Sequence, residues 1–306
     1  MSDASMDTGP LAFVGLGVMG EPMCRNLAHK CGRTVRAFDT QAEPLQRLSR
    51  HGVVACDSLA GAVGGAEVVF LSLPSGEVVH ELVHAAAGLL AHTHAGQIVV
   101  DLGTSPVETT RRLANDFAAR GATWVDAPVA RTRAAAEAGQ LSVMVGAAPA
   151  VFERVRPLIA SFGSDITRCG PVGCGQVVKI LNNMVLFETV VALAEAKAIG
   201  ERAGVDAALL FDTLSKGSAD SFALRNHGMK AMLPGDFPER AFSVRYARKD
   251  LLYALQLAEQ TGIDARGALL VDQWYQAAIA AGLGERYHPV IGTLVAGPKA
   301  GTGFDR

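Results

Sequence analysis

The sequence predicts an α/β domain built on a doubly wound parallel sheet over residues 1–170, followed by an all-α domain over residues 171–306. Three observations lead to this prediction. Short apolar runs alternate with helical segments through the first half, as expected of parallel strands covered by helices on both faces. A glycine-rich turn joins the first apolar run to a helix. After Gly170 the strand signal ends, and the segments that follow have helical patterns.

Composition limits the class of protein. A chain of 306 residues with 49 % apolar and 19 % charged residues is long enough for about two globular domains. A formal net charge of −2 provides no basic field, so nucleic acid is not expected as a partner. The five cysteines are scattered and odd in number, which does not indicate a disulfide framework. The polar opening and the lack of a membrane-like stretch predict a cytoplasmic protein with no membrane partner.

The first strand and its turn carry the strongest motif. The apolar run Leu11–Val14 is followed by a glycine-rich turn, residues 15–20, with the pattern GxGxxG. A helix begins directly after it, near Glu21, with Pro22 in its first turn. A GxGxxG between a strand and a helix is the setting of a Rossmann-type dinucleotide site, where phosphates face the first amides of the helix. Within this turn, the six residues expected to bind the cofactor are Gly15, Leu16, Gly17, Val18, Met19 and Gly20.

The second strand, at 34–38, ends at Asp39, about 20 residues beyond the glycine turn. A carboxylate there would accept hydrogen bonds from the ribose hydroxyls of the cofactor, and it would repel a 2′-phosphate. We therefore expect NAD to be preferred over NADP. Arg36 lies on the same strand, so NADP remains possible, and Asp39 could also be an ordinary acid at a strand end.

The remaining elements follow in order. Helices are expected from Glu43 to about His51, from Asp57 or Ser58 to about Gly64, and over 107–120. Strands are expected over 53–55, 67–73, 97–101 and 123–126. The run 67–73 is almost continuously apolar, which is typical of a buried parallel strand. A loop over 127–133, a strand over 141–145, a helix over 151–161 and a strand over 166–168 complete the first domain. Helices are expected over 176–203, 207–215, 222–233, 246–261 and 265–281.

Lys179 and Asn183 are the candidate catalytic pair. They are four residues apart near the start of a long apolar segment, so they share one face of a helix expected to be buried. Burial disfavours a charged lysine, and a lysine with a lowered pKa can exchange protons near neutral pH. The alternative is that Lys179 extends to solvent and that Asn183 makes only local hydrogen bonds.

Histidines and cysteines do not predict a metal site. His80 and His84 lie four apart on one expected helix, and His92 and His94 lie in an expected loop after it. Cys169 and Cys174 are close in sequence without a second pair of ligands. Because no acid or cysteine completes a set with the usual spacing, we interpret these histidines as surface residues.

Four motifs in order resemble those of the β-hydroxyacid dehydrogenases, whose members include 3-hydroxyisobutyrate dehydrogenase and tartronate semialdehyde reductase. The resemblance spans nearly the whole chain. The motifs are the glycine turn extended to Met23, Asp126-Ala-Pro-Val129, Gly173-x-Gly-x-x-x-Lys179-x-x-Asn-Asn183, and Lys249-Asp250-Leu251.

The resemblance implies roles for matching residues. Lys179 would be the general acid and base, Asn183 would orient substrate and lysine, and Lys249 would lie near cofactor and substrate. The nicotinamide half of the cofactor would meet Leu73, Pro74 and Thr104, although the spacing before Pro106 leaves open whether Thr104 or Ser105 faces it. The segment that grips the substrate carboxylate matches Val129, Ala130, Arg131 and Thr132.

This last segment departs from the family pattern, which commonly reads Ser-Gly-Gly where this chain has Ala130-Arg131-Thr132. An arginine can hold an oxyanion through two parallel hydrogen bonds, so Arg131 is a candidate anion clamp. The segment looks like that of sulfolactaldehyde reductases, which handle a sulfonate. The alternative is a solvated arginine, as Arg133 could also be.

The resemblance implies an oxidoreductase acting on a small anionic 3-hydroxy acid, such as 3-hydroxyisobutyrate, or on its aldehyde or keto form. An imine reductase and a non-catalytic scaffold remain rival readings, although both commonly lack the lysine found here. The apolar circumference of the long helix favours burial on all sides, in part against a second subunit, so a homodimer or homotetramer is expected.

Overall fold

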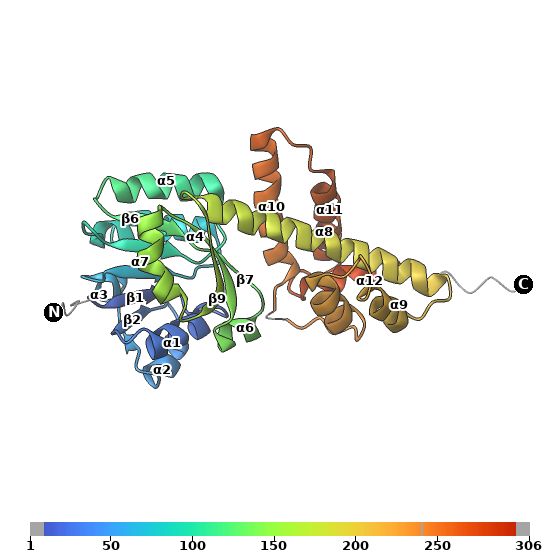
Figure 1. Ribbon diagram of the computed structural model, residues 1–306, viewed down its shortest axis with the longest axis horizontal. Helices are drawn as coiled ribbons and strands as arrows, with labels where there is room; N and C mark the ends of the chain where they lie inside the picture. The colour runs from blue at the N-terminus through green and yellow to red at the C-terminus, as the bar shows by residue number, and fades with distance from the viewer. Residues whose placement is uncertain (1–8, 240, 298–306) are drawn as a thin grey trace, which may run out of the picture. The chain divides into compact units, whose positions relative to one another are not determined.

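The computed structural model describes residues 9–239 and 241–297 (Figure 1), and the chain divides into two compact units, residues 1–179 and 180–306. The first is an α/β unit with a parallel-dominated sheet, and the second is helical. The expected fold class, a Rossmann-like domain followed by an all-α domain, is thereby confirmed.

Every strand named here lies in the first unit. In chain order, the strands are β1 Leu11–Val14, β2 Val35–Phe38, β3 Val54–Ala55, β4 Val68–Leu71, β5 Ile98–Asp101, β6 Thr123–Asp126, β7 Val129–Ala130, β8 Leu141–Gly146 and β9 Gly163–Gly170. They form one sheet with the order β3-β2-β1-β4-β5-β6-β8-β7, and β9 pairs with β8. The strand order reverses at β1, between β2 and β4, and ligands of open α/β sheets bind beyond the carboxyl ends at such a point.

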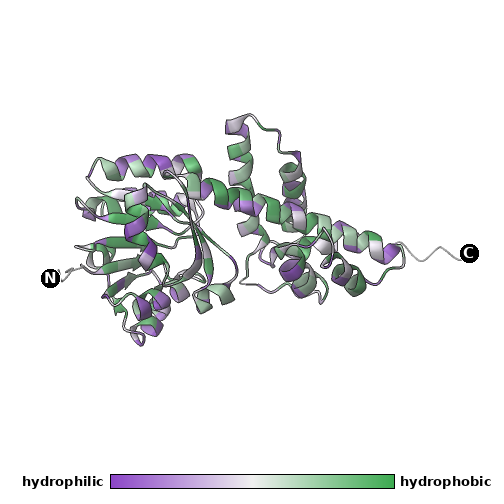
Figure 2. Cartoon of the chain, in the orientation of Figure 1, coloured by the Kyte–Doolittle hydropathy of each residue, from purple (hydrophilic) through white to green (hydrophobic). Residues whose placement is uncertain are grey.

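Helices cover both faces of this sheet. They are α1 Gly20–Lys30, α2 Ala42–Ser49, α3 Leu59–Val63, α4 Gly76–His84, the short 3₁₀ helix η1 Leu89–His92, α5 Val107–Ala118, α6 Arg133–Ala138 and α7 Pro149–Ile159. Successive side chains of a strand point to opposite faces. Leu11 and Phe13 of β1 accordingly join a core with α1, α2 and α7, whereas Ala12 and Val14 join a second core with α3, α4 and α5. Figure 2 shows the matching pattern, with strands mostly hydrophobic in colour and helices such as α5 mixed.

The far side of the sheet differs from the sequence-based expectation. The strands from β3 to β6 pair in parallel, but β8 runs antiparallel to both β6 and β7. Residues 127–133, expected to be a loop, contain the two-residue strand β7 and the beginning of α6. Thr132 starts that helix as its N-cap, because its side-chain oxygen accepts a hydrogen bond from the Ala135 amide.

The second unit is built around one long helix, α8 Cys174–Arg202, whose first six residues belong to the first unit. The other helices are α9 Ala207–Leu214, the π-helix η2 Leu224–Met232, α10 Val244–Thr261, α11 Arg266–Ala280, the short 3₁₀ helix η3 His288–Val290 and α12 Ile291–Val295. The sequence predicted an ordinary helix over 222–233, because apolar periodicity does not separate the π-helical bonding pattern from the α-helical one.

Helix α8 has a buried face and an exposed face. Phe187 and Val190 are fully buried in the core of the second unit, which also contains residues of α10 and α11. Leu181 and Val185, in contrast, are 40 % and 57 % exposed, so the residues that the structure describes do not cover this helix on all sides.

By length and composition alone α8 could cross a membrane, which the sequence reading did not anticipate. Core helices of soluble proteins meet the same criterion, and the buried face of α8 packs as a core helix does.

Candidate active site

The glycine turn after β1 is shaped by close packing. Gly15 has φ +90°, and a Cβ on it would lie 2.3 Å from the Ser72 carbonyl oxygen, just past the end of β4. A Cβ on Gly20 would lie 2.1 Å from the Gly15 carbonyl oxygen, which is too close for any side chain. A Cβ on Gly17 would meet no atom of the described chain within 4 Å. The turn is therefore closely packed at Gly15 and at Gly20, and it is open at Gly17.

Three residues between the glycines complete the turn. Leu16 is buried in the core, Met19 packs partly against it, and Val18 is 50 % exposed. Met19 is the N-cap of α1, and its side chain makes no capping hydrogen bond; the Glu21 amide donates to the Gly17 carbonyl oxygen. An uncapped helix start beside an open glycine is the arrangement that receives a phosphate.

Asp39 lies beside this turn at the end of β2. One carboxylate oxygen accepts a hydrogen bond from the Leu16 amide at 2.5 Å, and the other accepts one from the Gln41 amide at 2.8 Å. The carboxylate that the sequence assigned to the cofactor ribose therefore also fixes the glycine turn to β2.

The loops that follow β4 and β5 lie side by side. A Cβ on Gly103 would be 3.0 Å from the Leu73 carbonyl oxygen, and a Cβ on Gly76 would be 2.5 Å from Pro106. These close approaches bring Leu73 and Pro74 next to the segment that contains Thr104, which is 7 % exposed. The three segments assigned to the cofactor thus share the carboxyl edge of the sheet, from the glycine turn to the end of β5.

Thr104 and Ser105 differ in their surroundings. Ser105 is fully buried, and its hydroxyl donates a hydrogen bond to Asp101 at 3.0 Å. The Gly103 amide donates to the other oxygen of the same carboxylate at 2.9 Å. The hydroxyl of Ser105 is thereby held inside the loop, which leaves Thr104 as the better candidate to face a ligand.

A buried carboxylate fixes the beginning of α8 to the sheet. Asp126, at the end of β6, accepts hydrogen bonds from the Gly173 amide at 2.7 Å and the Gln176 amide at 2.9 Å. Burial raises the pKa of Asp126 to about 6, while the backbone amides of the helix start act in the opposite direction. The carboxyl group lies at the positive end of the α8 dipole, which favours its ionised form.

This anchored helix carries Lys179, one turn beyond its start, and the lysine side chain is buried with 8 % exposure. Asn183 follows four residues later in the same unbroken helix and is 2 % exposed. The carboxamide of Asn183 donates to Asp250 at 2.8 Å. Lys249 pairs with Asp250 at 3.1 Å, and its ammonium lies 4.0 Å from the centre of the Tyr246 ring.

Relatives of known activity resemble the chain over most of its length. The family model described as the NAD binding domain of 6-phosphogluconate dehydrogenase matches residues 10–170. The model described as NAD-binding of NADP-dependent 3-hydroxyisobutyrate dehydrogenase matches residues 173–292. The 3-hydroxyisobutyrate dehydrogenase of Pseudomonas aeruginosa is 38 % identical over 257 residues, covering 81 % of this chain and 85 % of the relative. The chain belongs to the β-hydroxyacid dehydrogenase family.

Two further relatives widen the comparison for this β-hydroxyacid dehydrogenase. The 2-(hydroxymethyl)glutarate dehydrogenase of Eubacterium barkeri is 33 % identical over 274 residues, which is 90 % of each chain. The solved structure of Mycobacterium tuberculosis 3-hydroxyisobutyrate dehydrogenase with L-serine is 32 % identical, with a TM-score of 0.84, and covers 94 % of this chain and 99 % of that one. Solved imine reductases share the fold at 16–17 % identity, which speaks to fold alone. The protein is an NAD(P)-dependent enzyme that acts on the CH–OH group of a hydroxy acid.

Arg131, the candidate anion clamp of the dehydrogenase, has protein partners in the structure. Its guanidinium pairs with Asp165 at 2.7 Å and donates to the Gln140 carbonyl at 2.7 Å and the Ser164 hydroxyl at 3.0 Å. Arg131 also has φ +88°, the only positive value among the described non-glycine residues. Val129 and Ala130 pair with β8, so this segment is a fixed edge of the sheet.

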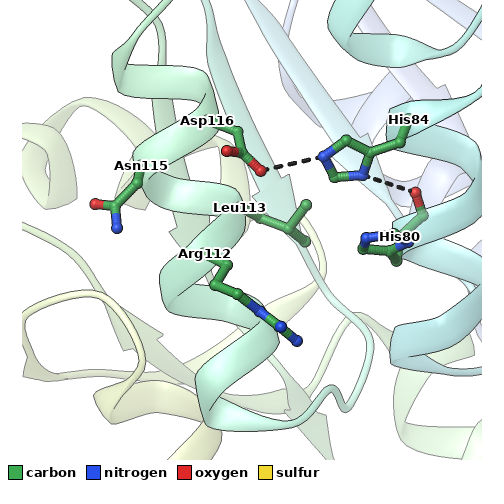
Figure 3. Close-up of a pocket in the computed structure, with 6 residues that line it drawn as sticks. All are labelled: His80, His84, Arg112, Leu113, Asn115 and Asp116. Atoms are coloured by element: carbon green, nitrogen blue, oxygen red, sulfur yellow. Dashed lines mark hydrogen bonds and ion pairs between the residues drawn. The ribbon is translucent and has the colours of Figure 1, made fainter.

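His80 and His84, two of the four histidines considered for a metal site, lie at another edge of the first unit. A hollow of about 200 Å³ between α4 and α5 is lined by His80, His84, Arg112, Leu113, Asn115 and Asp116 (Figure 3). His84 contacts the His80 carbonyl and the Asp116 carboxylate, both at 3.1 Å. His84 and Asp116 are near the carboxyl ends of their helices, which lie away from the cofactor edge. Among the described residues, no three His, Cys, Asp or Glu side chains gather as metal ligands. His92 ends the 3₁₀ helix η1, where a loop was expected.

Sequence reasoning about this dehydrogenase missed the residues that hold the site together. Asp101 and Gln176 are fully buried polar residues to which no role was assigned, and Ser105, also fully buried, was considered only as an alternative to Thr104. Asp126 and Asp250 were noted only as letters of family motifs. The amides bonded by Asp126 and the carboxamide bonded by Asp250 are distant in sequence. The one signal available in the sequence was therefore a polar residue at a position that the apolar pattern predicts to be buried.

Proposed function

We propose that this dehydrogenase interconverts a small 3-hydroxy acid and its aldehyde or keto form, with Lys179 as general acid and base and NAD as the preferred cofactor. One observation carries the proposal. A buried lysine lies one turn into a helix whose start is tied to the sheet by two hydrogen bonds to the Asp126 carboxyl group. A lysine held in this way can exchange a proton at a fixed position.

The residues of the cofactor edge fit a dinucleotide. Gly17 leaves open the space that a Cβ would fill, and the uncapped start of α1 can bind the pyrophosphate. When bound, the nicotinamide accepts or donates the hydride. Asp39 would bind the ribose hydroxyls and repel a 2′-phosphate. The specificity constants for NADH and NADPH test this assignment: Asp39→Asn should narrow the preference for NADH, and a wild-type preference for NADPH would contradict it.

In the proposed reaction Lys179 takes the proton of the substrate hydroxyl during oxidation and returns it to the carbonyl oxygen during reduction. Asn183 orients the substrate, and Asp250 holds the carboxamide of Asn183 in one orientation by accepting from it. Thr104 lines the nicotinamide side, since the hydroxyl of Ser105 is engaged by Asp101. Lys249 would stand near the substrate and cofactor.

The decisive experiment replaces the lysine. We expect Lys179→Ala to lower kcat by 10²–10⁴-fold, the usual contribution of a general acid or base. The dissociation constant for NADH, measured by fluorescence titration, should remain within a few-fold of the wild-type value. Lys179→Ala with near-native turnover would rule out the assigned role.

The relatives support a substrate class. The compounds in their names, 3-hydroxyisobutyrate, 2-(hydroxymethyl)glutarate and L-serine, are all 3-hydroxypropanoates that differ in the group on carbon 2. We therefore propose a 2-substituted 3-hydroxypropanoate, with its carboxylate bound along Val129, Ala130, Arg131 and Thr132. A substrate panel with both NAD and NADP, followed by nicotinamide absorbance, would rank these acids against tartronate semialdehyde, 4-hydroxybutyrate, sulfolactaldehyde and cyclic imines.

The alternative, an anionic-aldehyde reductase such as a sulfolactaldehyde reductase, depends on Arg131. Its guanidinium would have to leave Asp165 to clamp a sulfonate or carboxylate. If it does so, Arg131→Ala should raise KM for anionic substrates far more than for neutral ones. Equal changes for both kinds of substrate would favour a structural role for the arginine.

Turnover of cyclic imines in preference to hydroxy acids would favour an imine reductase. Hydride transfer from any small hydroxy acid to NAD, or from NADH to its carbonyl form, would exclude a non-catalytic scaffold. We also propose domains at residues 1–170 and 171–306, a cytoplasmic location, and a homodimer or homotetramer. The exposed Leu181 and Val185 of α8 support the oligomer, and light scattering after size exclusion would measure its mass.

A further inference from the structure

The side chain of Gln176 joins the beginning of α8 to the loop after β5. Its Nε2 donates a hydrogen bond to the Gly103 carbonyl oxygen at 2.8 Å, and its Oε1 accepts one from the Ser105 amide at 3.1 Å. These two partners stand immediately before and after Thr104. The glutamine is fully buried, so water does not compete for either hydrogen bond.

The same loop is held from a second direction. Asp101 accepts hydrogen bonds from the Gly103 amide and the Ser105 hydroxyl, at 2.9 and 3.0 Å. The backbone amide of Gln176 is in turn held by Asp126 at 2.9 Å. Gln176 thus joins two sets of hydrogen bonds. Its side chain bonds the loop that Asp101 also holds, and its backbone amide bonds Asp126 at the start of α8.

We propose that Gln176 is a positioning residue for the reaction, which sets the loop that carries Thr104 in a fixed relation to the turn of α8 that carries Lys179. The inference rests on the proposed function, because it assigns those two residues to the nicotinamide and to proton transfer. Lys179 comes three residues after Gln176, so both side chains project from the same side of the helix.

The chemistry of the carboxamide explains why a glutamine stands here. One end must donate to a carbonyl and the other must accept from an amide, as the backbone of a neighbouring strand would do. A methionine of similar size can do neither, and an ionised glutamate cannot donate to the Gly103 oxygen. A misplacement of about 1 Å in an active site can cost about 10²-fold in rate.

The test compares two buried glutamines of the same unit. Gln97 is also fully buried, and its Nε2 donates to the carbonyl oxygens of Val63 and Ala66, at the opposite end of β5 from the cofactor edge. Gln97→Met therefore controls for the loss of a buried carboxamide. Both methionine variants should lower Tm by similar amounts, whereas only Gln176→Met should disturb the site.

Three readouts are expected to separate the variants. In the protein without cofactor, hydrogen exchange of the Ser105 amide, followed by NMR, should become about tenfold faster in Gln176→Met only. With NAD and either 3-hydroxyisobutyrate or L-serine, kcat should fall about 10–100-fold in that variant, while the NADH dissociation constant and KM change less than about threefold. The deuterium isotope effect on kcat, measured with the carbinol-deuterated acid, should rise because hydride transfer limits turnover.

A second variant covers the case in which Gln176→Met does not fold. In Gln176→Glu, acidification protonates the carboxyl group, which can then donate to the Gly103 oxygen, so kcat relative to wild type should recover as the pH falls. A flat ratio across the pH range would overturn the inference. So would unchanged Ser105 exchange in Gln176→Met, an arm that needs no substrate.

The proposed function can fail separately. If Lys179→Ala keeps its turnover while Gln176→Met loses it, the lysine assignment is wrong and the positioning of the Thr104 loop stands. If Lys179→Ala is inactive and both glutamine variants have equal kcat, the positioning inference is wrong and the general acid and base stands.

Discussion

Acid should destabilise the helical unit through a pair of buried histidines. His227, in the π-helix, is 5 % exposed, and its ring lies 5.1 Å from that of the fully buried His288. Nδ1 of His227 bonds the Tyr287 hydroxyl, and Nδ1 of His288 bonds the Tyr275 hydroxyl. Nε2 of each ring is buried without a hydrogen-bond partner among the described residues. Neither ring can accept a second proton without a large cost in desolvation.

The magnitude follows from the pKa of His227, which burial lowers from 6.5 to about 4. Between these values the unfolded chain takes up a proton and the folded unit does not, so stability is present above pH 6.5 and is lost as the pH falls. At about 1.4 kcal/mol per pH unit, the loss from His227 alone between pH 7.5 and 5.5 is about 1.3 kcal/mol. Burial also holds the pKa of His288 well below its usual range, which adds a loss of the same sign.

The α/β unit should respond in the opposite direction. Burial raises the pKa of Asp126 from 3.8 to about 6, so the folded unit binds this proton more tightly than the unfolded chain does. Its free energy of unfolding should therefore rise by about 0.8 kcal/mol between pH 7.5 and 5.5. Because the two changes have opposite signs, a free energy of unfolding measured for both units together would partly cancel them.

The two tryptophans allow the units to be measured separately, because Trp124 lies in β6 and Trp274 lies in α11. In a Trp124→Phe background, urea unfolding followed by fluorescence reports on the helical unit. The test compares the pH dependence of the free energy of unfolding in this background with and without His227→Asn. The asparagine carboxamide can bond the Tyr287 hydroxyl but does not titrate. The loss between pH 7.5 and 5.5 should shrink by about 1.3 kcal/mol in the variant. Identical pH dependence in both proteins would refute the role of His227.

Predictions for substitutions at three other positions follow from the geometry of the backbone. Gly17→Ala should change the free energy of unfolding by less than about 0.5 kcal/mol, yet weaken NADH binding at least about tenfold in calorimetric titration, because its Cβ enters the open side of the turn. Gly20→Ala should instead cost about 1–3 kcal/mol or more in stability, since its Cβ meets the Gly15 carbonyl; equal stability of the two variants would contradict this contrast. Arg131→Gly should be more stable than Arg131→Ala by about 1 kcal/mol in urea unfolding, because both lose the Asp165 pair and only glycine accepts φ +88° without strain. An alanine variant as stable as the glycine variant would show that the strain is absent.

The sequence was sufficient for features that depend on local pattern. Alternating apolar runs predicted the central strands, and the spacing of Lys179 and Asn183 predicted their common helix. The glycine turn was predictable because GxGxxG between a strand and a helix constrains the backbone directly. Residues 127–133 were expected to be a loop, since the two-residue strand β7 is too short to show periodicity, and α6 is a single short helix.

Contacts between distant segments set the limit of sequence reasoning. Gln176 acts on residues more than seventy positions earlier, and Asn183 bonds an aspartate 67 positions later. Arg131 offers a guanidinium that suits an anion, but its Asp165 partner lies on another strand. Residue type indicated what each of these groups can bind, and only the fold indicates which group it meets.

The attachment of α8 to Asp126 has a consequence for how the protein is made. A first turn of helix is costly to form alone, and here its amides need a carboxylate that stands at the end of β6. Because β6 precedes Lys179 in the chain, it leaves the ribosome first, and we expect the turn that carries the lysine to form against a sheet that is already present. In a fragment that began at residue 171, the turn that carries Lys179 would fray, because the Asp126 carboxyl group would be missing. Residues 1–170 and 171–306 made as separate polypeptides would have to bind each other before that turn could form.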